Sequence, residues 1–209
     1  MSHEVETMAY AGELPWHGLG HEVPADLSPQ QMMEAAELDW SVEKQTLVTL
    51  EGAEVPEKKA LVRSSDNKVL DIVGKNWNPV QNIEAFEFFD DFVRSGDMQM
   101  HTAGSLKGGQ IVWGLAKVND SFELFGGDKV DSYLLFTNPH RFGQSIDVRF
   151  TPIRVVCNNT LTLSLSQEAN NVVKLNHKKQ FDAEEVKRML GVAEFKMNQY
   201  KELIERRLY

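Results

Sequence analysis

Cationic and aromatic side chains that could bind a nucleic acid gather in the second half of the chain. Lysine and arginine hold the phosphates of nucleic acids, and the bases of single strands also stack on aromatic rings. Three arginines lie in or just before one apolar run, residues 144–157, and lysines flank it on both sides. The candidate binding residues are Lys107, His140, Arg141, Phe142, Arg149, Arg154, Lys174, Lys178 and Lys179.

The apolar run 144–157 is typical of a strand with one solvent-exposed face. Its residues alternate, with Ile146, Val148 and Phe150 on one face and Ser145, Asp147 and Arg149 on the other. Pro152 prevents a regular ladder, so we expect a bulge that returns Arg154 to the exposed face of Arg149. Alternate residues lie about 6–7 Å apart, close to the phosphate repeat of an extended strand. An inert, solvated sheet face would show the same pattern, and this alternative stays open.

The charge distribution allows such a surface although the protein is acidic. The net charge is −9, and residues 1–60 carry all of it, with twelve acidic side chains against three lysines. Residues 132–181 carry six basic side chains against Asp147 and Glu168, the one basic stretch of any length. Salt screens charges beyond about 8–10 Å, so a local basic patch can bind phosphates on an acidic protein.

Other chemistry has weaker support in the sequence. His17 and His21 are four residues apart, with Glu13 and Glu22 nearby, which could hold a metal in an enzyme. The glycines between the two histidines argue against the helix that this spacing requires. Cys157 could act as a nucleophile, but a small buried thiol at the end of an apolar strand is the better interpretation. We predict no catalytic residue, no metal and no cofactor.

Length and composition indicate a globular protein of the cytoplasm. The 209 residues suit one large domain, and no run approaches the roughly 18 apolar residues of a membrane span. A single cysteine fits a reducing compartment. The first 40 residues are expected to form a wrapping segment without regular structure over residues 1–23, anchored by Trp16, and then a short helix. Ser28 followed by Pro29 is a helix start.

Residues 41–181 are predicted to form an α+β core, a curved antiparallel sheet of hairpins packed by a Phe-rich helix. A strand over 41–51 precedes a hairpin of 59–63 with 69–73, whose turn is Ser-Ser-Asp-Asn. Asn82 is expected to cap the Phe-rich helix, which ends at Gly96. Two further hairpins pair 98–102 with 110–118 and 129–137 with 144–157. Residues 159–165 favour a helix, although their leucines also alternate as in a strand.

Residues 182–209 are predicted to form a long C-terminal helix. Asp182 and Glu185 match a capping box, with Phe181 and Val186 as the accompanying hydrophobic contact. Apolar residues recur at helical spacing to the end of the sequence, and no capping residue follows. We expect either that the chain continues or that this helix meets another subunit.

Four segments resemble a known family. Residues 1–20 (MSHEVETMAYAGELPWHGLG), 77–82 (WNPVQN), 134–141 (LLFTNPHR) and 154–161 (RVVCNNTL) are similar to the phage/plasmid-like domain-of-unknown-function family nine-three-two. The resemblance implies a protein of phages, prophages or plasmids, often encoded among replication and recombination genes. It also implies a longer C-terminus. The family has no agreed catalytic residues, so none are carried over.

The expected architecture is also similar in outline to phage single-strand annealing proteins of the Red-beta and RecT types, which form rings or filaments around DNA. This is an analogy of fold alone. Our leading hypothesis is a non-catalytic, homo-oligomeric binder of single-stranded DNA in recombination or replication. A second hypothesis is a protein-interaction accessory factor of a phage that uses Trp16 and the acidic N-terminal region. A metal-dependent enzyme built on His17 and His21 is the third.

Overall fold

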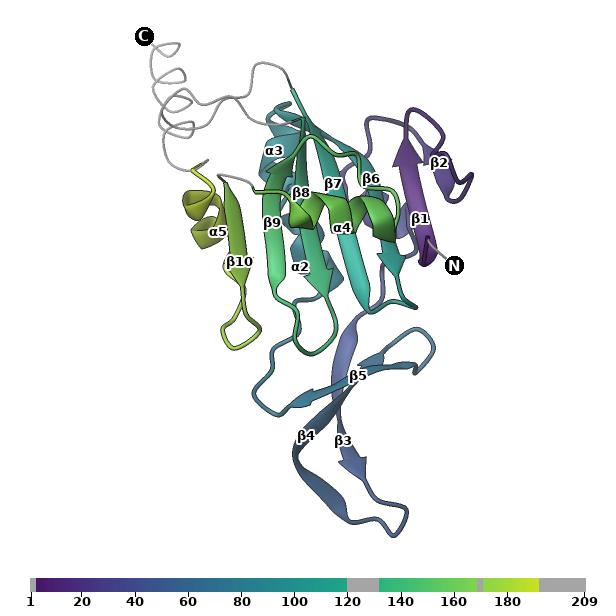
Figure 1. Cartoon of the computed structure of the whole chain (residues 1–209), viewed down its shortest axis with the longest axis vertical. Coiled ribbons are helices and arrows are strands. Elements are labelled where there is room, and N and C mark those ends of the chain that lie inside the picture. The colour runs from purple at the N-terminus through teal and green to yellow at the C-terminus, as the bar shows by residue number, and fades with distance from the viewer. Residues whose placement is uncertain (1–2, 120–131, 169–170, 192–209) are drawn as a thin grey trace.

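A computed structural model describes residues 3–119, 132–168 and 171–191 of the chain. The strands of this part are β1 (Val5–Ala11), β2 (His21–Val23), β3 (Val42–Val48), β4 (Glu54–Arg63), β5 (Val69–Gly74), β6 (Met98–Leu106), β7 (Ile111–Val118), β8 (Tyr133–Pro139), β9 (Ile146–Thr151) and β10 (Val172–Leu175). The helices are α1 (Pro29–Ala35), α2 (Asn82–Glu87), α3 (Asp90–Arg94), α4 (Asn158–Ser166) and α5 (Ala183–Met189). The predicted α+β class is confirmed (Figure 1).

The larger sheet has seven strands in the order β10-β9-β8-β7-β6-β1-β2. It is mixed rather than antiparallel, because β1 and β2 pair in parallel while the other neighbours are antiparallel. The predicted absence of a strand in residues 1–23 is therefore wrong. In β1 the run Met8–Ala11 is buried on both faces, so it has neither polar alternation nor helical period. Residues 5–11 and 21–23 are therefore strands of the sheet and do not wrap over it.

The smaller sheet has three antiparallel strands in the order β3-β4-β5 and projects below the larger one (Figure 1). The predicted hairpin of 59–63 with 69–73 is confirmed, with Lys59 opposite Val73. Its turn contains Asn67 at a φ of 57°, a left-handed conformation that asparagine tolerates. Local turn chemistry was thus sufficient to place this hairpin.

Helices α1, α2 and α3 cover one face of the larger sheet. Ser28 is the N-cap of α1, as the sequence predicts, and the structure adds a reciprocal capping box with Gln31. The predicted Phe-rich helix is two short helices, because α2 ends at Glu87 and α3 begins at Asp90. Its aromatic cluster is nonetheless buried as expected, consisting of Phe86, Phe88, Phe89 and Phe92.

Helix α4 covers the opposite face, which confirms the helix predicted for residues 159–165. Leu161 of α4 packs with Trp113 and Leu135 in a second buried cluster. Cys157, just before α4, is fully buried, in agreement with the structural interpretation of this thiol. Both faces of the sheet are therefore covered, and this decides which polar residues of β9 reach solvent.

The C-terminal part of the described chain holds one short helix. Asp182 caps α5 by accepting hydrogen bonds from the N–H groups of Glu184 and Glu185. The predicted continuation of this helix to Tyr209 lies outside the described residues. Among the helices that are described, none is both long and apolar enough to cross a membrane.

Candidate nucleic-acid interface

Arg149, the centre of the predicted binding face, is buried and has a full set of partners. Its side chain is 2% exposed. Its Nε and Nη2 donate to the two carboxylate oxygens of Asp147, at 2.6 and 2.5 Å. Its Nη1 donates to the backbone carbonyls of Ser164 and Gln167, at 3.0 and 3.2 Å.

The prediction that Arg149 faces solvent is therefore wrong. The alternation along β9 was assigned correctly, but α4 lies over the face that the sequence suggested was open. Ser164 of α4 also hydrogen bonds to Thr151 of β9 at 2.9 Å, which fixes the helix over this strand. A guanidinium held in a bidentate pair and by two carbonyls is not available to a polyanion.

Arg154 is half-buried and lies on a different surface. Strand β9 ends at Thr151, so the predicted bulge at Pro152 does not form and the alternation does not continue. Arg154 donates to His101 Nε2 at 2.9 Å and to the carbonyls of Ala11 and Glu13 at 3.3 and 2.6 Å. Burial, and then the charges of Arg154 and Lys117, lower the pKa of His101 to about 4. The expected shared face of Arg149 and Arg154 is thus absent.

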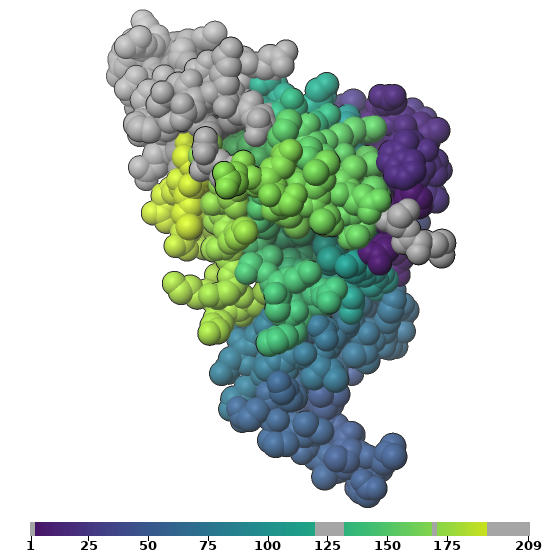
Figure 2. Space-filling view, in the orientation of Figure 1, coloured from purple at the N-terminus to yellow at the C-terminus, as the bar shows by residue number. Residues whose placement is uncertain are grey.

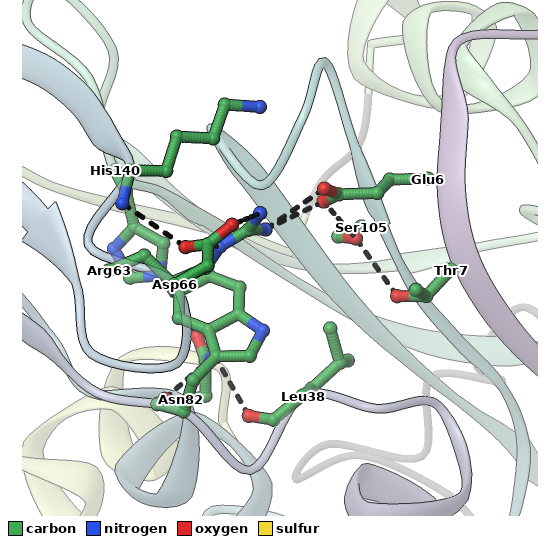
Figure 3. A network of polar contacts seen from close by, with 10 residues as sticks. Glu6, Thr7, Leu38, Arg63, Asp66, Asn82, Ser105 and His140 are labelled. Atoms are coloured by element: carbon green, nitrogen blue, oxygen red, sulfur yellow. Dashed lines mark hydrogen bonds and ion pairs between the residues drawn. The ribbon is translucent and has the colours of Figure 1, made fainter.

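His140, expected to touch bases, is fully buried, and its ring lies against Trp40 with the ring centroids 5.4 Å apart. Asn82 donates through Nδ2 to the carbonyls of Leu38 and Trp40, so its Oδ1 must accept from His140 Nε2, at 2.9 Å (Figure 3). Burial lowers the pKa of His140 to about 3, which keeps the ring neutral. Asn82 itself was expected to cap α2, but Gln81 occupies the N-cap position.

A charged network that was not predicted from the sequence lies beside His140. Arg63 of β4 is 8% exposed and binds both oxygens of Glu6 on β1, at 3.0 and 2.9 Å, and both oxygens of Asp66 (Figure 3). The hydrogen bonds from Arg63 lower the pKa of Asp66 to about 2. Glu6 and Arg63 are far apart in sequence, and no local pattern links them. Their ion pair joins the two sheets.

The remaining candidate residues lie together at one end of the larger sheet. Leu106 pairs with Ile111, Ile111 with Pro139, and Ile146 with Leu175. The connections that follow β6, β8 and β10 must therefore emerge at the same end. In Figures 1 and 2 this end faces the three-stranded sheet, across the middle of the molecule.

We refer to this surface as the cationic end. Its basic residues are Lys68, Lys107, Arg141, Lys174, Lys178 and Lys179. Lys68 was not among the predicted residues, and its ammonium group lies against Gly108 in the connection after β6. Carboxylates also lie beside this set. Glu4 is 3.7 Å from Lys107, Glu6 and Asp66 both bind Arg63, and Asp71 accepts from the Phe142 N–H at 2.7 Å. Glu84 lines one pocket together with Lys179. Cations outnumber carboxylates, so the cationic end is positive on an acidic protein.

Phe142 gives the cationic end an exposed aromatic ring. Its side chain is 68% exposed, while its backbone is fixed to Asp71 of β5. Large exposed aromatic rings are costly in water and serve as stacking surfaces for bases in proteins that bind single strands. Lys174, Lys178 and Lys179 are exposed and Arg141 is partly exposed. Together with Lys107 and Phe142, these are six of the nine predicted residues, and all six are found at this end.

The histidine pair proposed for a metal has other partners. His17 Nε2 hydrogen bonds to the carbonyl of Val156 at 2.9 Å, and its Nδ1 accepts from the N–H of Leu19 at 3.0 Å. His21 lies 3.4 Å from Glu37 on the surface. Within residues 3–119, 132–168 and 171–191, no group of three or more His, Cys, Asp or Glu side chains is placed to hold a metal ion.

Trp16 does not anchor the N-terminal segment, contrary to expectation. Its ring is 68% exposed and contacts His3 and His17 at centroid distances of 4.7 and 5.4 Å. Leu14 and Leu19 are also exposed. The segment is held instead by the backbone pairing of β1 and β2 and by the hydrogen bonds of Arg154 to Ala11 and Glu13.

Comparison with protein families supports the expected relationship. Residues 69–207 match the model of the family described as Domain of unknown function (DUF932). No curated protein and no solved structure matches the chain. The matched region includes most of the larger sheet, α4 and all of the cationic end except Lys68. Because it covers more than half of the sequence, the chain belongs to the DUF932 family.

Proposed function

We propose that this protein binds single-stranded nucleic acid across the cationic end, without catalytic chemistry. The observation that carries the proposal is the strand register, which brings the cations of three separate connections and the exposed ring of Phe142 to one end of the sheet. The predicted role in recombination or replication and the predicted homo-oligomer stay part of the proposal. They rest on the family resemblance and on the analogy with annealing proteins.

The dimensions of this surface suit a short stretch of single strand. Neighbouring strands lie about 4.8 Å apart, so the path from β6 to β10 is about 19 Å long. An extended single strand would place roughly three phosphates along it, at about 6–7 Å each. The ring of Phe142 lies within this path and could stack on one base, an interaction that contributes about 1–3 kcal/mol.

The proposal is tested by the fluorescence anisotropy of a labelled 30-nucleotide oligo-dT, titrated with the full chain at several salt concentrations. If the roughly three phosphates along this path are neutralised, log K should fall with log salt with a slope of about −2. Lys178→Ala combined with Lys179→Ala should reduce that slope by about 1.4, because two contacts are lost. Phe142→Ala should weaken binding about 5- to 150-fold with little change in slope.

Lys117→Ala is the matched control, since Lys117 is exposed but lies at the opposite end of β7, opposite Tyr133. It should change neither the affinity nor the slope. An affinity for oligo-dT that does not change with salt concentration would contradict the proposal. An equal loss of affinity in Lys117→Ala and in the double lysine variant would also contradict it.

A second candidate function, a protein-interaction factor, is favoured by the exposure of Trp16 together with Leu14 and Leu19. Three large apolar side chains within six residues are thus exposed, and a concentration of exposed apolar side chains is typical of a protein contact. If these side chains bind a protein, Trp16→Ala should abolish a complex that purifies with the wild-type chain and leave oligo-dT binding unchanged. Recovery of the same complex with Trp16→Ala would remove this candidate.

A further inference from the structure

The connection after β10, residues 176–180, is attached to a segment about 100 residues earlier in the chain. The N–H of Asn78 donates to the carbonyl of His177 at 2.7 Å, and His177 Nδ1 donates to the carbonyl of Asn78 at 3.0 Å. Asn78 Nδ2 also donates to the carbonyl of Lys178 at 3.3 Å. Three hydrogen bonds thus join Asn78 to two residues at the start of this connection.

An aromatic stack reinforces these hydrogen bonds. The rings of Trp77 and His177 are parallel within 17°, with centroids 3.9 Å apart. His177 is buried, although the lysines that follow it are exposed. The carbonyl of Asn78 can only accept, so the proton of the neutral His177 ring is on Nδ1. Burial lowers the pKa of His177, which maintains this neutral form.

The segment that receives His177 is itself fixed to the larger sheet. Asn138 of β8 donates through Nδ2 to the carbonyl of Val80 at 2.8 Å. His140, two residues after Asn138, hydrogen bonds through Nε2 to Oδ1 of Asn82 at 2.9 Å. Residues 78, 80 and 82 are therefore each bound by a different buried side chain. The attachment of the 176–180 connection continues through this segment into the core of the sheet.

We propose that Trp77, Asn78 and His177 form a latch that holds Lys178 and Lys179 at the cationic end, and that these three are positioning residues for nucleic-acid binding. This inference rests on the proposed function. None of the three touches the nucleic acid. They act by fixing the backbone from which the two lysines project, because a free connection would have to be ordered at the moment of binding, which weakens affinity.

A double-mutant cycle on oligo-dT affinity separates this role from a general structural one. His177→Ala alone should weaken binding about 5-fold in 0.1 M salt, within the roughly 25-fold loss expected when both lysine contacts are removed. In the Lys178→Ala, Lys179→Ala background, His177→Ala should have no further effect, since the residues that it positions are gone. Equal losses in both backgrounds would overturn the proposal.

The conservative variant Trp77→Phe keeps an aromatic surface for stacking on His177 and should restore at least half of the affinity lost in Trp77→Ala. His21→Ala, which removes an exposed histidine, is the control for unspecific effects of histidine loss. Failure of Trp77→Phe to bind better than Trp77→Ala counts against the latch.

Amide hydrogen exchange of the unbound protein tests the latch without any ligand. In His177→Ala the amides of residues 177–179 should exchange at least about 10-fold faster, while those of β7 stay unchanged. Faster exchange in a protein that binds no oligo-dT would show that the latch exists but that the proposed function is wrong. If His177→Ala leaves both oligo-dT binding and amide exchange unchanged, the chain binds nucleic acid but the latch does not exist.

Discussion

At the scale of single residues, two arginines are buried inside the protein, although arginine side chains are usually exposed to solvent. Arg63 and Arg149 are both nearly inaccessible to solvent, and both are bound by carboxylates and further acceptors. A buried guanidinium without such partners would be very costly, so each arginine is stable only because its partners are in place. In the structure, the polar contacts of both side chains join elements of the fold.

Removing the charge of Arg149 should therefore destabilise the protein. Arg149→Met leaves Asp147 buried without its cation, which we expect to lower the free energy of unfolding by about 3–5 kcal/mol. Urea denaturation followed by circular dichroism measures this. Adding Asp147→Asn should recover part of the loss, and Arg188→Met, on the exposed surface of α5, should change stability by less than about 0.5 kcal/mol. A loss below about 1 kcal/mol in Arg149→Met would show that the pair is not buried as described.

At the scale of elements, the N-terminal strand depends on a close approach that only glycine allows. Gly104 of β6 lies opposite Met8 of β1 and Trp113 of β7. A Cβ at this position would lie 2.5 Å from the carbonyl oxygen of Thr7 and would overlap the Trp113 ring. Gly104 was predicted to lie in a hairpin connection, but the turn begins only at Lys107, and the glycine is required inside the strand.

Gly104→Ala should destabilise the protein by about 3 kcal/mol, because a backbone atom of β1 or the large Trp113 ring would have to move. Gly74→Ala is the matched control, since Gly74 also lies in a strand but a Cβ added there would have no atom within 4 Å. The midpoints of thermal unfolding of the two variants compare them directly. Similar midpoints would contradict the tight packing of β1 against β6.

At the scale of the whole molecule, two sheets meet along a line of buried polar groups. Arg63 links β4 to β1, and the neighbouring Asn82 and His140 link α2 to the end of β8. The cationic end lies along the same junction. Its geometry therefore depends on the two sheets keeping their relative positions, and conditions that disturb the buried histidines should weaken both stability and binding.

Acid should reduce stability through His140. Its pKa is lowered from 6.5 to about 3, so the unfolded chain binds a proton below pH 6.5 that the folded chain does not. The stabilisation is complete above pH 6.5 and is lost progressively toward pH 3. Between pH 6.5 and 5 this amounts to about 2 kcal/mol, measurable by urea unfolding. The pKa of Asp66 is lowered from 3.8 to about 2. Its contribution to stability is therefore present above about pH 3.8 and is lost as the pH falls toward 2.

His140→Gln keeps a donor for Asn82 and removes the titrating ring, so its stability should fall less steeply in this range. His101 and His177 also have lowered pKa values and contribute in the same direction, so the variant retains part of the slope. An identical slope in the variant and the wild type would show that His140 is not the titrating group.

The sequence by itself determined the elements that have local signals. Ser28 with Pro29, the turn of residues 64–67 and Asp182 each stabilise their element through neighbours in the chain, so their positions could be predicted without the fold. The family followed from four short segments, and the match over residues 69–207 agrees with it. Asp147 and Arg149 lie two residues apart on one strand face, a spacing that could have indicated their ion pair, although the pair was not predicted.

Only the tertiary structure decided which polar residues reach solvent. The covering of β9 by α4, the insertion of β1 beside β6 and the contact of Glu6 with Arg63 join segments that no local pattern connects. Burial is a property of what packs against a face, and alternation along a strand shows only that two faces differ. For the same reason, the cationic end arose from strand register, which places distant connections side by side.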